Sequence, residues 1–177
     1  MDIPDQSWVS RKMQDAAIGL DDPDAQSRAV IFSAVAINTG MGAVPFGINV
    51  VSFISVDVAM VVLVGSIYGC HYTNEQAAQL IKQILGSVTL STGAYFLVAK
   101  LFAESAKAGG AAVLPFYVMG MSLDGLLCGS ITYAIGFTSR TFFKREMDLS
   151  KSEMRREFKK HYRDGKRHTK NSEEDGP

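Results

Sequence analysis

Two aspartates, Asp57 and Asp124, are the residues whose type and surroundings most strongly suggest chemistry. Each lies in a long apolar stretch of this 177-residue chain. An ionisable side chain inside an apolar segment is costly to bury and is commonly functional. The pair could form a proton or ion relay, or could bind the ammonium groups of Lys82 or Lys100. They could also face a partner helix, cap a broken helix or point to water, and this structural role is our first expectation.

The remaining polar residues do not form a recognisable catalytic or metal-binding pattern. Asn38 and Asn49 are expected to make hydrogen bonds between helices rather than to bind a ligand. No phosphate-binding loop, dinucleotide-binding glycine motif, zinc-protease motif or nucleophile elbow occurs in the sequence. The adjacent pair Cys70 and His71 lacks two further ligands nearby, as a zinc site requires. We therefore expect no catalytic residue, no metal and no cofactor, and a protein that is not an enzyme.

The elements that must hold these residues are predicted to be helices. Residues 29–56 contain no Asp, Glu, Lys, Arg or His, and a bilayer-spanning helix needs about 20 mostly apolar residues. Gly and Pro residues between Gly40 and Gly47 are expected to break this stretch into a helical hairpin or a re-entrant turn. The expected fold is all-α, a membrane-associated set of helical hairpins or a bundle, with an amphipathic N-terminal helix and a basic C-terminal helix.

Local signals place the helix ends and divide the chain into four parts. Asp22 before Pro23 predicts a helix start, and Thr73-x-x-Gln76 and Ser150-x-x-Glu153 are capping boxes. Gly69 is typical of a helix C-cap. Asp164-Gly165 is expected to end the last helix. The predicted parts are an acidic amphipathic segment (1–28), an apolar membrane-associated domain (29–146), a basic amphipathic helix (147–165) and a disordered tail (166–177).

Small residues predict close helix packing in the apolar domain. Gly65 and Gly69 are four positions apart, as are Gly125 and Gly129, a spacing that lets helices approach closely in membrane bundles. On this reading Asp57, Asp124 and Asn49 are polar residues inside the membrane, and the Gly faces mediate homo-oligomerisation. The alternative is tight packing within a soluble bundle.

The basic C-terminal segment is the main candidate for binding. Residues 140–170 hold twelve Lys or Arg and five Asp or Glu, so the positive-inside tendency places the C-terminus in the cytoplasm, near anionic lipid. The residues expected to bind lipid headgroups or a cytosolic protein partner are Lys151, Arg155, Arg156, Lys159, Lys160 and Arg163. Nucleic-acid binding is not expected, because no groove-reading motif is present.

Two apolar segments resemble a known family. GAVPFGINVVSFISVDVAMVVLVGSIYG (42–69) and LPFYVMGMSLDGLLCGSITYAIGFTSRTFF (114–143) are similar to an uncharacterised family of hydrophobic helical domains, fused to or encoded beside Era-like bacterial GTPases. The resemblance covers roughly residues 28–145. It implies a helical module at the bacterial inner membrane that serves a GTPase. This sequence has no GTPase domain, so nucleotide hydrolysis would have to come from a partner in trans.

Three functions are compatible with these patterns. The first is a non-enzymatic membrane-associated module that self-associates or docks a cytosolic partner. The second is a small ion- or proton-conducting oligomer, similar to a transporter, that uses Asp57 and Asp124. The third is a soluble helical binding protein whose apolar surface is covered by a partner.

Overall fold

Helices form the regular structure in the part of the chain that the structure describes. The computed structural model describes residues 6–42, 50–87 and 114–174, and the side chains of residues 8–41, 54–86 and 125–168. These ranges contain no strand. The helices are α1 (Gln6–Asp15), α2 (Pro23–Gly42), α3 (Val50–Ile67), α4 (Asn74–Ser87), α6 (Leu114–Lys144) and α7 (Lys151–Glu174). The expectation of an all-α fold is therefore confirmed for these residues.

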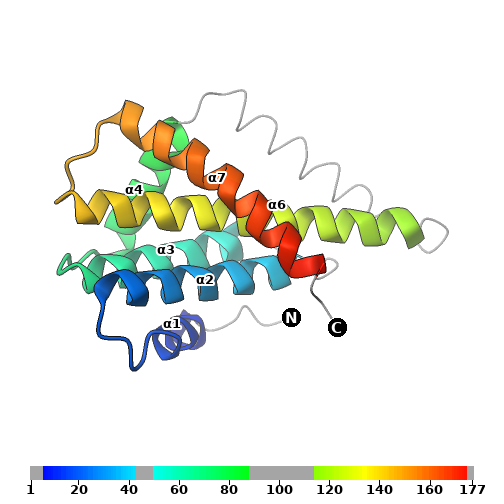
Figure 1. Cartoon of the computed structure of the whole chain (residues 1–177), viewed down its shortest axis with the longest axis horizontal. Coiled ribbons are helices and arrows are strands. Elements are labelled where there is room, and N and C mark those ends of the chain that lie inside the picture. The colour runs from blue at the N-terminus through cyan, green and yellow to red at the C-terminus, as the bar shows by residue number, and fades with distance from the viewer. Residues whose placement is uncertain (1–5, 43–49, 88–113, 175–177) are drawn as a thin grey trace.

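Helices α2, α3 and α6 form the centre of the molecule. Figure 1 shows α2 and α3 running in opposite directions, with α6 alongside them. Apolar side chains from all three are buried between them, and complete burial of a Val, Ile or Met side chain contributes about 1.5–3 kcal/mol to stability. These residues include Val30, Ile31, Ala34, Met60, Val61, Val64, Ile131, Ala134 and Ile135. The apolar stretch expected to enter a bilayer contributes Val30, Ile31, Ala34, Val35 and Val56 to the protein's own core.

Amphipathic helices cover this centre. On α4 the buried residues Ala77, Leu80, Ile81 and Ile84 follow the spacing of one helix face. Helix α7 packs on α6 and α4, whereas α1 packs on α3 and α2. In α1, Val9 and Met13 are buried and Trp8 is partly exposed. The N-terminal helix therefore docks on the protein's own core.

The local chemistry at the helix ends follows the sequence signals. The Asp22 carboxylate accepts a hydrogen bond from the Ala25 amide at 2.9 Å. Thr73 and Gln76 form both bonds of a capping box, as do Ser150 and Glu153. These expected starts are confirmed.

The ends of α3 and α6 are Schellman motifs. At α3 the amides of Gly69 and Cys70 donate to carbonyls of Ser66 and Gly65, and Gly69 has a φ of 74°. The C-cap role expected of Gly69 is therefore confirmed, because the motif requires a left-handed residue. At α6 the corresponding left-handed residue is Glu146, with a φ of 53°.

Helix α7 does not end where the sequence indicated. It continues through Asp164 and Gly165 to Glu174, so residues 166–174 are helical rather than part of a disordered tail. An ideal Cβ on Gly165 would lie 3.0 Å from the Tyr133 Cβ and 3.1 Å from the Ser130 carbonyl oxygen. The missing side chain lets α7 pass close to α6, and this packing offsets the poor intrinsic helix propensity of glycine.

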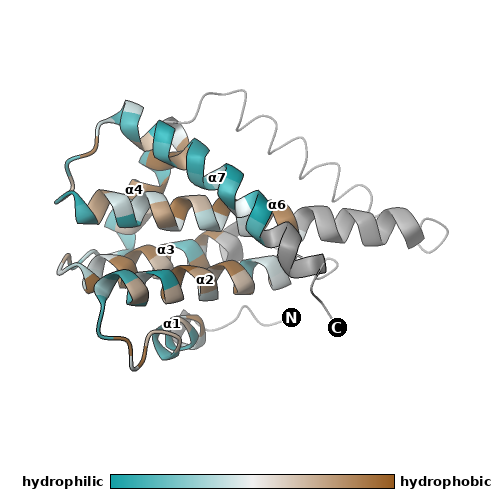
Figure 2. Ribbon diagram, viewed as in Figure 1, coloured by the Kyte–Doolittle hydropathy of each residue, from teal (hydrophilic) through white to brown (hydrophobic). Residues whose placement is uncertain are grey.

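The membrane-spanning interpretation is not supported by the described helices. Within the described ranges, none combines the length and apolarity that a bilayer crossing requires. Figure 2 shows brown residues concentrated on α2 and α3 and teal residues along much of α7. The apolar surfaces of α2 and α3 are used in packing against each other and against α6. Helix α2 continues through Gly40 to Gly42, and residues 43–47 of the expected break lie outside the described residues.

Candidate functional site

The outward face of α7 is the most strongly charged surface among the described side chains. Between positions 151 and 168, the exposed residues are Ser152, His168 and eight cations. The cations are Lys151, Arg155, Arg156, Lys159, Lys160, Arg163, Lys166 and Arg167. We call these eight residues the cationic face. It includes all six residues that the sequence nominated for binding.

The three acidic residues in the same range are less exposed than these cations. Glu153 closes the capping box and binds Arg145 through a 3.0 Å ion pair. Glu157 is largely buried, and its carboxylate lies 3.4 Å from Nε2 of His161. Asp164 is also less exposed than the cations. Lys160 of the cationic face lies 4.0 Å from the Glu157 carboxylate, so partly exposed carboxylates border the exposed cations of residues 151–168.

Packing of the opposite side of α7 fixes the orientation of the cationic face. Met154 and Phe158 are buried in the core, and Gly165 lies against α6. The His161 ring lies 5.3 Å from the Phe137 ring of α6, centroid to centroid. Burial lowers the pKa of His161, which favours its neutral form. The apolar side of α7 is buried against α6 and α4. Only the charged side of α7 is therefore accessible to a ligand.

A second polar cluster lies inside the three central helices. Asn38 of α2 donates from Nδ2 to Asp57 Oδ1 of α3 at 3.2 Å and to Thr132 Oγ1 of α6 at 2.7 Å. All three side chains are buried, and Asp57 is only 1% exposed. We call these three residues the core triangle. It ties α2, α3 and α6 together at one level of the bundle.

The environment of Asp57 favours its protonated form. Removal from water raises the pKa of this carboxyl to about 8, although hydrogen bonds with Thr132 and Asn38 act in the opposite direction. No charged side chain contributes to this pKa, so the pairing considered with Lys82 does not occur. Oδ2 of Asp57 and Oδ1 of Asn38 have no hydrogen-bond partner among the described residues. A neutral carboxyl in this position costs far less to bury than an unpaired carboxylate.

A third cluster holds the other end of the bundle together. Asp24 accepts a 2.7 Å hydrogen bond from the Tyr68 hydroxyl and forms ion pairs with Arg140 at 3.0 Å and Lys144 at 2.8 Å. The Lys144 hydrogen bond, followed by that of Tyr68, lowers the pKa of Asp24 well below its usual range. Ser27 adds hydrogen-bonding contacts to Tyr68 and Arg140. The cluster links the start of α2 to the ends of α3 and α6.

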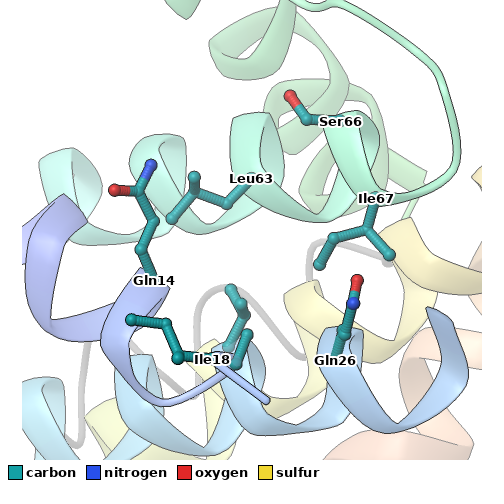
Figure 3. Close-up of a pocket in the computed structure, with 8 residues that line it drawn as sticks. Gln14, Ile18, Gln26, Leu63, Ser66 and Ile67 are labelled. Carbon is teal, nitrogen blue, oxygen red and sulfur yellow. The ribbon is translucent and has the colours of Figure 1, made fainter. Parts of the chain in front are cut away.

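An open groove lies between the α1–α2 turn and α3. It has a volume of about 430 Å³ and is lined by Gln14, Ala17, Ile18, Gln26, Val30, Leu63, Ser66 and Ile67. Figure 3 shows Gln14 and Ile18 on one side of this space and Leu63, Ser66 and Ile67 on the other. Helix α7 contributes no residue to it.

The structure gives the four nominated glycines different positions. An ideal Cβ on Gly65 would lie 3.1 Å from Cζ of Phe143, so this face is already occupied by α6 of the same chain. Gly69 lies beyond the end of α3 and has nothing within 4 Å of an ideal Cβ. Gly125 and Gly129 are buried in α6. Gly65 and Gly69 therefore do not form a shared helix face for a second copy.

Two of the nominated polar positions cannot be placed. Asn49 lies outside the described residues, and the side chain of Asp124 lies outside the described side chains. Lys100, the second cation considered as a partner for Asp57 and Asp124, lies outside them as well. No group of three or more potential metal ligands occurs among the described residues.

Sequence reasoning missed several residues that the structure brings together. Thr132 completes the core triangle from 94 positions away along the chain. The sequence assigned Asp24 only to the acidic N-terminal segment. It indicated that Asp24 lies in the first turn of a helix, but no local pattern indicated that Arg140 and Lys144 would bind it.

Comparison with protein families gives one match. Residues 19–167 match the family model described as a domain of unknown function (DUF697), which includes α2 to α7 up to position 167 and leaves α1 outside. No curated protein and no solved structure matches the chain. Because the match extends over most of the sequence, this chain belongs to the DUF697 family.

Proposed function

We propose that this protein is a non-enzymatic helical docking module that binds anionic lipid surfaces through the cationic face of α7. The observation that carries this proposal is the concentration of exposed Lys and Arg residues on α7. Eight exposed Lys or Arg residues lie between positions 151 and 168, whereas the acidic residues of this range are only partly exposed. Each such cation near an anionic membrane contributes about 1 kcal/mol of attraction.

The proposed attachment is peripheral and electrostatic. The apolar stripe of α7 is buried against the protein, so insertion of this stripe into lipid would require α7 to leave the bundle. Binding by charge alone is strongly weakened by salt, because the Debye length falls from about 10 Å at 0.1 M to about 3 Å at 1 M. The bundle remains folded at the lipid surface in this proposal.

Two further expectations belong to the same proposal. The resemblance to domains associated with Era-like GTPases supports a GTPase as a partner in trans, with hydrolysis performed by that partner. Self-association would use a surface other than Gly65, whose Cβ position faces Phe143. We favour a packing role for Asp57 over ion conduction, because uncharged Asn38 and Thr132 enclose it and burial favours its neutral form.

Flotation with lipid vesicles tests the proposed attachment. The purified chain is mixed with vesicles of phosphatidylcholine and phosphatidylglycerol, or of phosphatidylcholine alone. We expect binding only to the anionic vesicles and loss of binding at high salt. The double variant Lys159→Glu/Arg163→Glu should bind at least about 30-fold more weakly, which corresponds to about 2 kcal/mol for two lost cations.

A matched variant separates position from net charge. Lys12→Glu/Lys82→Glu makes the same charge change at exposed residues of α1 and α4 and should bind like the unmodified chain. Equal weakening by both variants would contradict a site on α7. Failure of the unmodified chain to bind anionic vesicles, with binding to single-stranded nucleic acid instead, would replace lipid by nucleic acid as the ligand.

A further inference from the structure

The groove between the α1–α2 turn and α3 is lined by uncharged residues. Aliphatic side chains form its walls, namely Ala17, Ile18, Val30, Leu63 and Ile67. The polar groups of Gln14, Gln26 and Ser66 complete the lining. An apolar side chain can enter this space of about 430 Å³ without displacing an ion or burying a charge.

The turn beside the groove exposes aliphatic side chains to solvent. Ile18 is 74% exposed and Leu20 is 36% exposed. Within the turn, the Ile18 amide donates to the Asp15 carbonyl and the Leu20 amide donates to the Ala17 carbonyl. The side-chain amide of Gln26 donates to the Leu20 carbonyl and ties the turn to α2. Because the turn is held in place before any partner arrives, covering its side chains costs little additional ordering.

A projecting aliphatic turn and an aliphatic groove therefore lie on the same surface patch. Figure 3 shows Ile18 on one side of the groove and Leu63 and Ile67 on the other. A two-fold dimer requires a patch that fits a copy of itself, because each contact is made twice with the roles of the two copies exchanged. When the turn of one copy enters the groove of another, the reverse contact also forms.

The exposed charges around the turn balance. Residues 11–28 contain three cations and four aspartates, and one of these aspartates, Asp24, is paired with Arg140 and Lys144. The three cations and the other three aspartates are exposed, namely Arg11, Lys12, Arg28, Asp15, Asp21 and Asp22. Two copies of the patch bring equal numbers of both signs to a shared interface, so no net repulsion opposes their contact.

The same balance argues against an occupant selected by its net charge. An anionic lipid surface would attract the three cations and repel the three exposed aspartates. A strongly basic or strongly acidic protein segment would meet the same cancellation. A second copy of the patch offers both the balanced charge and the aliphatic side chains that the groove can accept.

We propose that the chain forms a two-fold dimer in which Ile18 and Leu20 of each copy pack into the groove of the other. There they would contact Leu63 and Ile67 of α3. The apolar surface removed from water supplies the affinity, whereas exposed ion pairs at the rim contribute little. This inference rests on the self-association included in the proposed function, for which it names the surface, and it does not depend on lipid attachment.

The proposed dimer leaves the cationic face of each copy accessible. Helix α7 packs on α6 and α4, whereas the groove is built from the α1–α2 turn, α2 and α3. Figure 1 places α1 and α7 on different sides of the central helices. Dimerisation at the groove therefore does not compete with the lipid site proposed on α7.

Sedimentation equilibrium without vesicles tests the proposal. We expect a monomer–dimer equilibrium of the purified chain between about 1 and about 200 μM. Its dissociation constant should change less than about threefold between about 0.1 M and about 1 M salt, because exposed ion pairs contribute little. This response separates dimerisation from vesicle binding, which high salt should abolish. A chain that stays monomeric while it binds anionic vesicles would overturn the dimer and leave the lipid attachment intact.

Variants of the protein locate the interface. Ile18→Lys should raise the dissociation constant at least tenfold, because an ammonium group would have to lose its hydration in an uncharged groove. Ser66→Trp fills the groove from an exposed position on α3 and should have a similar effect. Leu85→Lys is the matched control at an exposed leucine of α4 and should leave the constant unchanged. Equal effects of Ile18→Lys and Leu85→Lys, or no effect of Ser66→Trp, would overturn the proposal.

Crosslinking in a mixture of unlabelled and ¹⁵N-labelled chains gives a second readout. A benzophenone amino acid replaces Leu20, which does not line the groove of its own chain. We expect crosslinks between a labelled and an unlabelled chain, from position 20 to Leu63, Ser66 or Ile67. Crosslinks confined to single chains, or formed between copies only at other helices, would contradict the proposed contact. Circular dichroism of each variant confirms that its helices are retained.

Discussion

Asn38 on α2 donates a hydrogen bond to the carboxyl of Asp57 on α3 across 3.2 Å, and both side chains are excluded from water. Burial raises the pKa of Asp57 from 3.8 to about 8. Between these values the unfolded chain releases a proton that the folded chain retains. Folding stability should therefore fall as pH rises from about 4 to about 8, by up to about 1.4 kcal/mol per pH unit, and then level off.

The variant Asp57→Asn isolates this contribution. The amide resembles the protonated carboxyl but does not titrate, so its stability relative to the unmodified chain should increase steadily from pH 5 to pH 8. Urea unfolding at several pH values measures the difference, in which the contributions of other titrating groups cancel. Parallel curves for the two proteins would show that Asp57 is ionised in the folded state. Asp57→Ala should be less stable at pH 5, because it removes a hydrogen-bond partner of Asn38 and Thr132.

The Asp24 cluster should stabilise the fold at neutral pH and lose this contribution in acid, whereas the contribution of Asp57 is lost as pH rises. Asp24→Asn keeps an acceptor for Tyr68 but loses the ion pairs with Arg140 and Lys144, so we expect a loss of about 1–2 kcal/mol near pH 7. Because its folded pKa is depressed, the contribution of Asp24 is lost as pH falls below 3.8. Thermal unfolding at pH 7 and pH 3 measures both effects. Asp21→Asn, at an exposed position, should change stability by less than about 0.5 kcal/mol.

Gly136 marks the closest packing of α6 against its neighbours. An ideal Cβ there would lie 2.9 Å from two side-chain carbons of Ile31 and from Sδ of Met60. Gly136→Ala should therefore destabilise the fold by about 1–3 kcal/mol through overpacking. Gly40→Ala, in α2 with nothing within 4 Å of the new Cβ, should stabilise it by about 0.5–1 kcal/mol. Chemical denaturation compares them, and similar stabilities would contradict the close approach at Gly136.

Features set by neighbouring residues could be predicted from the sequence. The capping boxes at Thr73 and Ser150 and the C-cap at Gly69 form as expected, because their hydrogen bonds join residues only a few positions apart. The cations of α7 were also recognisable, although their separation from Glu153 and Glu157 depended on which side of the helix faces α6.

Features that depend on packing between distant segments could not be predicted in the same way. Gly165 resembles a helix terminator on local propensity, yet it lies inside α7, where the absence of a side chain allows close packing against Ser130 and Tyr133 of α6. The apolar composition of 29–56 satisfies a bilayer and a protein interior equally well. Whether this stretch packs in a protein interior depends on the distant helix α6, which packs against α2 and α3 and whose Thr132 accepts a hydrogen bond from Asn38.

The core triangle also has a consequence for the order of folding. Its two hydrogen bonds from Asn38 span 19 and 94 positions of the chain. The nearer contact closes with the α2–α3 hairpin, whereas the farther one requires a much longer loop to close and a larger loss of chain entropy. Such distant contacts slow the acquisition of native structure. The polar centre between α2 and α3 is therefore completed only when α6 packs and Thr132 accepts its hydrogen bond from Asn38.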